Sequence, residues 1–314
     1  MIKKQNSKKI KLIPSDFEKM FEEKLNPYVN KKIKDYNFIY SDVSEIERDN
    51  CLKIIFQTLL KDFIVYAGEH RQKHWEKGWN ENLKNFQKNK KIKDIIPKYF
   101  KYDILRINQK FIKILSKDFE KNCLSVIINW LSDKYMRKAN SIYEFGCGTG
   151  HHLLNIREVN PEANIWGLDW AKSSQKIIKE LSKKLSDPKL FTQQFDFFHP
   201  DKNLILDKDS IVYTVAALEQ TGDNFKPFVK YLLKNKPKLC IHIEPIGELL
   251  DENNLLDYLS IKYFEKRNYL SGFLDYLKQL EKKDKIKILK AQRTYIGSLF
   301  IDGYSVIVWA PNYK

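Results

Sequence analysis

The sequence predicts an α/β fold in which a seven-stranded, doubly wound mixed sheet follows a mostly helical N-terminal domain. Up to about residue 136, apolar residues recur mainly at the three-and-four spacing of amphipathic helices. After Asn140, short β-rich runs alternate with helical segments, which is typical of βαβ units and a parallel sheet. The chain has 314 residues, of which 43% are hydrophobic, so it can bury a sizeable core and is neither disordered nor fibrous.

Three parts are expected along the chain. Residues 1–13 are polar and rich in lysine, and they are expected to form a flexible basic tail. Residues 14–136 are expected to form the helical N-terminal domain and to cover the substrate. Residues 137–314 are expected to form the sheet domain, with a helical insertion at about 248–283.

The helices of the N-terminal domain are expected from local patterns. Ser15-Asp16-Phe17-Glu18 resembles a capping box at the start of a helix. Amphipathic helices are expected over 46–69 and 108–136, and irregular stretches around 75–82 and 95–102.

The sheet domain has seven β-rich segments. They are expected as strands at 141–145, 164–168, 190–195, 210–215, 239–243, 288–295 and 304–309. Helices are expected between them at 151–158, 171–185, 224–235 and 248–283. A short Ile301-Asp302-Gly303 connection between the last two strands indicates that the final strand runs antiparallel.

The net charge of +16 is concentrated in the N-terminal part. Residues 1–140 carry 31 basic and 18 acidic side chains, a net of +13, whereas residues 141–314 carry 25 and 22, a net of +3. Only 7 of the 56 basic residues are arginine, the residue that base readers and phosphate clamps favour. The charge therefore indicates a lysine-rich solvated surface, and a nucleic-acid partner is a possible but less favoured interpretation.

Other sequence features bear on location. No run approaches 18 consecutive apolar residues, so no membrane span is expected, and the basic start leads into polar residues rather than a signal peptide. The cysteines at 51, 123, 147 and 240 form no CxxC pair, which argues against a zinc ribbon or a disulfide framework. These features favour a cytoplasmic protein.

The most informative segment is the glycine-rich stretch that ends in Gly146-Cys147-Gly148-Thr149-Gly150. It follows a predicted strand and precedes a predicted helix, an arrangement that lets backbone N–H groups approach a ligand closely. The spacing is G-x-G-x-G, and His151 stands where a dinucleotide-binding turn would have its third glycine. No Gly-Lys-Ser/Thr follows, so a P-loop is excluded.

The segment from Glu144 to Gly150 resembles the first motif of class I S-adenosylmethionine-dependent methyltransferases, and the resemblance covers about residues 135–310. It implies a Rossmann-like methyltransferase fold and S-adenosyl-L-methionine as the cofactor, with S-adenosyl-L-homocysteine as the product. By this resemblance Glu144 supports the methionine end, Asp169 binds the ribose hydroxyls, and Asp196 lies near the adenine. The implied cofactor-binding residues are Glu144, Gly146, Cys147, Gly148, Gly150, Asp169, Trp170, Asp196 and Phe197. The alternative is a doubly wound fold that binds another nucleotide or none.

Two glutamates follow the fourth and fifth predicted strands and are the candidate catalytic residues. Because ligands bind at the carboxyl ends of parallel strands, Glu219 and Glu244 are both expected to point toward the methyl-donor cleft. They would bind or deprotonate a substrate hydroxyl, jointly hold a divalent metal, or form a hydrogen-bonding scaffold. A metal is possible but not expected. His151 and His152 are expected near the cofactor, where a neutral imidazole would serve as a donor; a helix-capping or surface role is the favoured interpretation. His242 is expected to be packed in the core, and the role of His199 is open.

Two segments are candidate substrate contacts. The stretch 71–82 contains His74, Trp75 and Trp79, which would form either a stacking platform or a structural plug. The predicted insertion contains Arg267, Asn268 and Tyr269, and in methyltransferases of this class such insertions cover the substrate. A purely structural role is the alternative for each segment.

The turn after the fourth predicted strand bears on the substrate class. It reads Leu218-Glu219-Gln220-Thr221, not the Pro-Pro-Tyr or Pro-Pro-Phe turn common in enzymes that methylate base amino groups. The favoured hypothesis is methylation of a small molecule, such as a hydroxyl group of a sugar or another biosynthetic metabolite. RNA methylation through the basic N-terminal domain, protein methylation and a non-catalytic binding partner are the alternatives, and the oligomeric state is left open.

Overall fold

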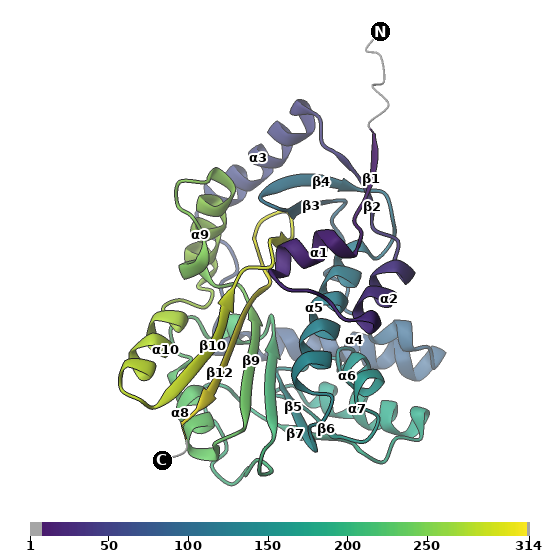
Figure 1. Ribbon diagram of the computed structural model, residues 1–314, viewed down its shortest axis with the longest axis vertical. Coiled ribbons are helices and arrows are strands. Elements are labelled where there is room, and N and C mark those ends of the chain that lie inside the picture. The colour runs from purple at the N-terminus through teal and green to yellow at the C-terminus, as the bar shows by residue number, and fades with distance from the viewer. Residues whose placement is uncertain (1–7, 313–314) are drawn as a thin grey trace.

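The computed structural model describes residues 8–312 and contains a seven-stranded mixed sheet at its centre (Figure 1). The spatial order is β10-β12-β9-β8-β5-β6-β7. The strands are β5 (Ser141–Phe145), β6 (Asn164–Asp169), β7 (Leu190–Gln194), β8 (Ile211–Val215), β9 (Leu239–Glu244), β10 (Ile286–Gln292) and β12 (Ser305–Pro311). Strand β12 pairs antiparallel with both β9 and β10, whereas the pairs among β5 to β9 are parallel. The predicted fold class is confirmed.

Helices cover both faces of this sheet, because its central strands are buried on both sides. One face packs against α5 (Phe119–Tyr135), α6 (Leu153–Val159) and α7 (Lys172–Leu185). The other packs against α8 (Lys226–Asn235) and α10 (Phe273–Lys282). Successive side chains of β5 point to opposite faces of the sheet. Ile142 therefore packs in the core on the first face, and Tyr143 and Phe145 pack in the core on the second.

The N-terminal region contains α1 (Pro14–Phe21), α2 (Pro27–Asp35), α3 (Glu45–Leu59) and α4 (Gln72–Asn89), with short 3₁₀ turns at Glu69–Arg71 and Ile92–Ile95. It also contains strands that the sequence did not predict. These are β1 (Lys9–Lys11), β2 (Ile39–Asp42), β3 (Ile104–Ile107) and β4 (Lys110–Ile114), and they form a second sheet with β11 (Ile296–Gly297) in the order β1-β2-β4-β3-β11.

This second sheet corrects two predictions. Part of the predicted tail is strand β1, whose Lys9–Lys11 pairs antiparallel with β2; residues 1–7 lie outside the described residues. The start of the predicted 108–136 helix is instead the hairpin of β3 and β4, whose two-residue turn places Asn108 and Gln109 at φ of 50° and 59°. Such a turn usually carries Asn-Gly, so its sequence signal is weak here.

Helix α4 corrects the prediction of an irregular stretch at 75–82, because it runs unbroken through that segment. Trp75, Trp79, Leu83 and Phe86 follow helical spacing along one side of it. The predicted 46–69 helix ends earlier, at Leu59.

Helix boundaries differ from two further predictions. Helix α1 is capped at Ile13, whose N–H donates to the Asp16 carboxylate at 2.9 Å, so Ser15 is not the cap. The insertion at 248–283 consists of two helices, α9 (Leu255–Arg267) and α10, because Asn268 and Gly272 adopt left-handed backbone conformations between them.

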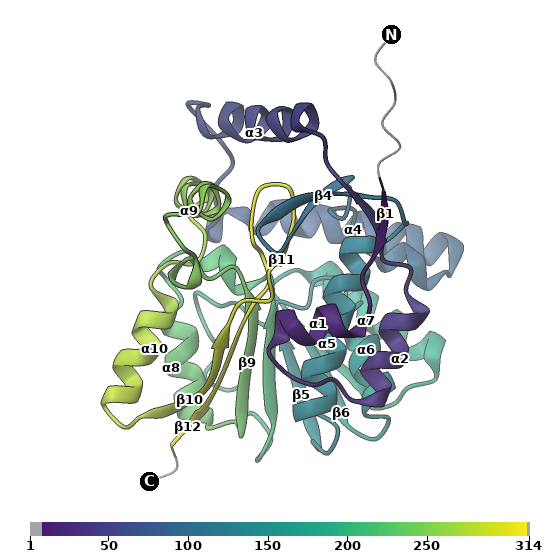
Figure 2. The same cartoon turned by 45° about the horizontal axis from the view of Figure 1, so that its top comes forward.

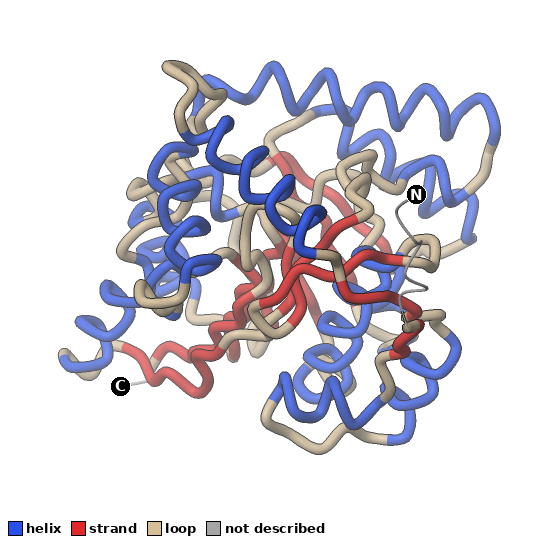
Figure 3. Tube along the Cα trace, turned by 90° about the horizontal axis from the view of Figure 1, so that it is seen from above, coloured by secondary structure: helices blue, strands red, loops and turns tan. Residues whose placement is uncertain are grey.

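The chain reverses its direction of sheet growth between β5 and β8, which is where a doubly wound sheet forms its ligand crevice. The second sheet lies over one end of the large sheet, and α3 lies across the top, packed on α9 (Figures 1 and 2). From above, helices surround the central strands on both sides (Figure 3). Within residues 8–312, the helices are too short or too polar to cross a membrane.

Candidate functional site

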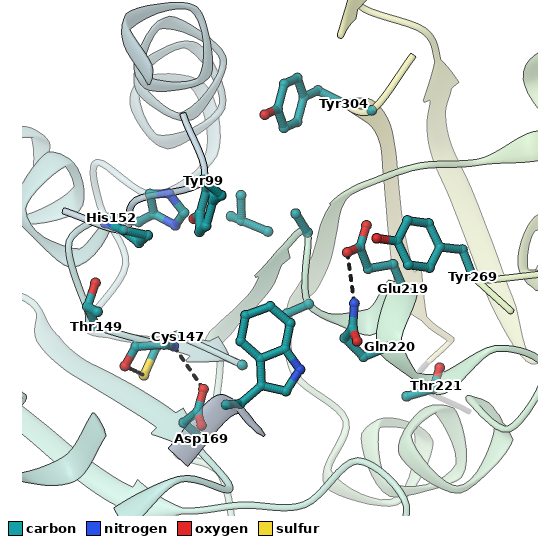
Figure 4. Close-up of a pocket in the computed structure, with 18 of the residues that line it drawn as sticks. Tyr99, Cys147, Thr149, His152, Asp169, Glu219, Gln220, Thr221, Tyr269 and Tyr304 are labelled. Carbon is teal, nitrogen blue, oxygen red and sulfur yellow. Dashed lines mark hydrogen bonds between the residues drawn. The ribbon is translucent and has the colours of Figure 1, made fainter. Parts of the chain in front are cut away.

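A cavity of about 330 Å³ lies at the carboxyl ends of β5, β6, β7 and β8, the size of a small-ligand site (Figure 4). Its floor is the glycine turn and the segments after β6 and β8. Its cover comes from the N-terminal region, which contributes Trp75, Trp79, Tyr99, Tyr102 and Glu120. The cavity therefore joins parts of the chain that are far apart in sequence.

The glycine turn after β5 presents its backbone to this cavity. Gly146 and Gly148 have φ of 72° and 53°, in the left-handed region that glycine adopts without strain. A Cβ atom at Gly146 would lie 2.4 Å from the Cβ of Ala217, so only glycine fits there. Cys147 also lines the cavity, and burial raises the pKa of its thiol well above the usual range, so it is no thiolate nucleophile.

Asp169, at the end of β6, faces the glycine turn across the cavity floor. Its carboxylate accepts the N–H of Gly148 at 2.8 Å and the N–H of Ala171 at 2.8 Å. Burial raises its pKa to about 6, against these hydrogen bonds. Two carboxylate oxygens offer about four acceptor positions, so further hydrogen bonds to a ligand remain available. Trp170 lines the cavity beside it.

Glu144 lies behind the glycine turn and does not line the cavity. Its side chain is fully buried, and it bonds the Nδ1 atom of His152 at 3.0 Å and the hydroxyl of Tyr213 at 2.9 Å. His152 does line the cavity, and its Nε2 atom is buried without a partner among the described residues. Glu144 therefore fixes the orientation of His152, and His152 presents the free polar atom. Gly150, at the end of the turn, packs against α7 instead of the cavity.

The segment after β7 places aromatic rings, but not its carboxylate, at the cavity. Phe195 and Phe197 line it. Asp196 turns away, accepting the N–H of Phe198 at 2.9 Å and lying 3.4 Å from the Nε2 atom of Gln72. The resemblance implied that Asp196 lies near the adenine. In the structure its carboxylate instead accepts hydrogen bonds from its own loop and from Gln72 at the start of α4.

Two tryptophans of α4 cover the glycine turn. Trp75 and Trp79 stack with ring centroids 5.3 Å apart, and a Cβ at Gly148 would lie 3.0 Å from the Trp79 ring. Both indole N–H groups are buried without a partner among the described residues. Glu76 ties this helix to α7, since its carboxylate accepts the N–H of Ser173 at 3.2 Å. His74 is exposed and packs edge-on against Trp75, outside the cavity lining.

The end of α9 contributes two of its three candidate residues. Arg267 and Tyr269 line the cavity, and a guanidinium N–H of Arg267 donates to the Tyr269 hydroxyl at 3.2 Å. Asn268 ends the helix in a left-handed conformation, and its side-chain amide donates to the carbonyl of Ala67 at 3.2 Å. It is a structural cap, and the structure does not bring it to the cavity.

The two candidate glutamates occupy different positions. Glu219 lines the cavity and is 9% exposed; burial and the nearby Glu244 raise its pKa to about 8. Glu244 is fully buried behind the loop, where its carboxylate accepts the N–H groups of Ala217, Leu218 and Glu219, each at 3.1 Å. The expectation that both point into the cleft is therefore wrong for Glu244, because the loop after β8 needs an acceptor for its N–H groups.

Sequence reasoning missed a carboxyl group on the covering side. Glu120 of α5 lines the cavity, is 6% exposed and accepts the hydroxyl of Tyr304 at 3.1 Å. Burial raises its pKa to about 7. The available signal was its helical register with Leu124, Ile127 and Leu131, which places an acidic side chain on the apolar side of the helix.

The histidines and possible metal ligands complete the site. His242 is a packed core residue, as expected, bonded to Thr214 at 3.0 Å and to the indole N–H of Trp309 at 3.0 Å. His199 is exposed and lies 3.0 Å from Glu69. His151 lines the cavity together with His152. Between residues 8 and 312, no group of three or more His, Cys, Asp or Glu side chains is arranged to hold a metal ion.

No family model and no curated protein matches this sequence. Among solved structures, the chain is similar to an O-methyltransferase from neocarzinostatin biosynthesis, solved with S-adenosyl-L-homocysteine and 1,4-dihydroxy-2-naphthoic acid, at 14% identity and a TM-score of 0.44 over 63% of this chain and 58% of that one. It is also similar to the small RNA methyltransferase HEN1, at 17% identity and a TM-score of 0.46 over 65% and 28%. A third similar structure is magnesium protoporphyrin IX methyltransferase from Synechocystis PCC 6803. Its sequence identity is 13% and its TM-score is 0.45, and the match covers 61% of this chain and 83% of that one. All three TM-scores are below 0.5.

Proposed function

We propose that this protein is an S-adenosylmethionine-dependent methyltransferase that acts on a small molecule. The observation that carries the proposal is the single cavity, in which a glycine turn and Asp169 at one side meet a pocket of aromatic and carboxyl side chains at the other. The first side matches the motif of the methyltransferase family, and the second offers a place for an acceptor next to it. Both sides belong to the same cavity, as in-line transfer between two bound molecules requires.

The residues around the glycine turn fit the cofactor. Gly146, Cys147 and Gly148 of the turn line the cavity, Asp169 keeps acceptor positions for ribose hydroxyls, and the rings of Trp170 and Phe197 offer faces for the adenine. The unpartnered Nε2 atom of His152 offers a polar contact for the methionine end. A bound S-adenosylmethionine would supply an activated methyl group, so the protein mainly has to position the acceptor.

Two carboxyl groups can handle the proton of an acceptor hydroxyl. With a pKa of about 7, Glu120 is partly ionised at neutral pH and can accept a proton, the usual condition for a general base. With a pKa of about 8, Glu219 is mostly protonated at neutral pH and can donate a hydrogen bond to the acceptor. We assign the base role to Glu120 and the orienting role to Glu219.

The N-terminal region supports a small acceptor over RNA. Its side chains close over the cavity, which is the arrangement expected if residues 14–136 act as a substrate cover. Under this cover the cavity of about 330 Å³ has the size of a small-ligand site.

The test is methyl transfer from radiolabelled S-adenosylmethionine into a fractionated cell extract. We expect label in the fraction below about 1 kDa that ribonuclease and protease leave unchanged. Label confined to RNA and released by ribonuclease would support the RNA alternative and contradict the proposal. Tight cofactor binding with no labelled product in any fraction would support the non-catalytic alternative.

A further inference from the structure

Two arginines from distant parts of the chain lie close enough near the cavity for their charges to repel each other, although only Arg267 lines it. Arg71 lies at the start of α4 and is 9% exposed, and Arg267 lies at the end of α9 and lines the cavity. A backbone hydrogen bond joins the segment before Arg71 to the end of α9, because the N–H of Ala67 donates to the carbonyl of Arg267 at 2.7 Å. Asn268 strengthens this connection through its hydrogen bond to the carbonyl of Ala67.

Neither guanidinium has an acidic partner. In the part of the chain that the structure describes, no carboxylate lies within 4.0 Å of Arg71 or Arg267, and the Nε atom of each is buried without a hydrogen-bond acceptor. Each lies near aromatic rings instead, Arg71 at 5.8 Å from the Trp75 centroid and Arg267 at 5.2 Å from that of Tyr269. A buried arginine is usually paired with an acid, as Arg293 is here with two buried aspartates.

The surrounding charges leave this pair positive. Burial lowers the pKa of Arg71 and the charge of Arg267 lowers it further; burial also lowers the pKa of His74, and the charges of both arginines add to that effect. Lys77 also lowers the pKa of His74, so it adds to the excess of positive charge around the two arginines. The neighbouring acid is Glu219, which is mostly neutral at pH 7 and therefore compensates little of the charge.

We propose that Arg71 and Arg267 bind an anionic group, a carboxylate or a phosphate, on the acceptor substrate. A buried Nε–H group without an acceptor is costly, and an anion with two or three oxygens satisfies such groups with strong hydrogen bonds. The acceptor's remaining part lies against the cavity wall formed by Tyr263, Tyr269 and Phe300, of which Tyr263 and Phe300 stack with centroids 5.1 Å apart. This inference rests on the proposed function and names the substrate class of the same site.

The experiment uses simple aryl probes, because the walls of this part of the cavity are aromatic. The full-length protein is saturated with S-adenosyl-L-homocysteine, and benzoate, phenyl phosphate and the neutral benzamide are titrated calorimetrically. The same titrations are made with Arg71→Gln, Arg267→Gln and, as the matched control, Lys73→Gln, which removes a positive charge from the exposed side of α4.

We expect at least one anionic probe to bind the wild-type protein about tenfold or more tightly than benzamide, the effect of a charge-assisted hydrogen bond. A preference for benzoate indicates a carboxylate substrate, and a preference for phenyl phosphate indicates a phosphate. Both arginine variants should lose the preference, and Lys73→Gln should keep it. Because the comparison among probes needs no variant, it holds even if an arginine variant does not fold.

Two outcomes would overturn the inference. Equal binding of benzamide and both anions would show that the pair recognises no anion on the acceptor. A tenfold loss of S-adenosyl-L-homocysteine affinity in Arg71→Gln or Arg267→Gln would assign the pair to the cofactor's own carboxylate. Failure of the wild-type protein to bind S-adenosyl-L-homocysteine at all would instead contradict the proposed function.

Discussion

Replacing Glu219 by glutamine should make the protein more stable at alkaline pH. Burial and Glu244 raise the pKa of Glu219 from 4.5 to about 8. In the unfolded chain the carboxyl group ionises near pH 4.5, whereas in the fold it stays protonated until about pH 8, so folding becomes less favourable as the pH rises between these values. At about 1.4 kcal/mol per pKa unit, the full cost above pH 8 is on the order of 5 kcal/mol.

Glutamine removes this cost because it cannot ionise, and its side-chain oxygen can still accept the hydrogen bond that Gln220 donates at 3.0 Å. Loss of the attraction to Arg267 offsets part of the gain. We therefore expect Glu219→Gln to raise the free energy of unfolding by roughly 2–4 kcal/mol at pH 8.5, and by less than about 1 kcal/mol at pH 4.5.

The assay is urea unfolding followed by circular dichroism at both pH values, with linear extrapolation to water. Glu252→Gln is the matched control, because Glu252 is exposed and its replacement removes the same charge from the surface. Equal stability of Glu219→Gln and the wild-type protein at pH 8.5 would refute the reasoning, because it would show that the buried carboxyl group costs the fold nothing.

Three further predictions follow from the site. Glu244→Ala should lower the free energy of unfolding by about 3 kcal/mol or more, because it leaves the N–H groups of three loop residues without an acceptor. Thermal and urea unfolding would measure this change, and a loss below about 1 kcal/mol would contradict the scaffold role of Glu244. Gly146→Ala should destabilise by about 2 kcal/mol or more, since its Cβ meets that of Ala217 and its φ is left-handed, and a neutral result would show that the loop moves aside. With an identified acceptor, kcat should fall below an apparent pKa near 7, where Glu120 is protonated, and Glu120→Gln should lower kcat by about a hundredfold or more and remove that pH dependence; an unchanged profile would exclude Glu120 as the base.

The sheet domain could be predicted from the sequence because its elements carry strong local signals. The strand over Ser141–Phe145 was predicted to the residue, since a short β-rich segment ends abruptly in a glycine turn. The position of Asp169 at the cavity followed from its place at a strand end. Glu144 and Asp196 show the limit of that rule, because a strand-end carboxylate can turn to a neighbouring histidine or to its own loop.

The N-terminal region was harder to predict because its short strands depend on distant partners. Strand β1 exists through pairing with β2, and β11 comes from the far end of the chain to join β3. Neither pairing leaves a local pattern that differs from a polar loop. The same holds for the residues that cover the site. Glu120 and Arg71 are brought to the cavity region only by the packing of helices from different parts of the chain, which no local sequence pattern predicts.

The most direct test of the account is calorimetric titration of the full-length protein with S-adenosylmethionine. We predict saturable binding at one site per chain, and a loss of affinity of at least about tenfold in Asp169→Ala, which removes the acceptor of two hydroxyl hydrogen bonds. Replacement of the exposed Asp62 by alanine should leave the affinity unchanged. Absence of saturable binding to the wild-type protein, or equal affinity in Asp169→Ala, would contradict the assignment of this cavity to the cofactor.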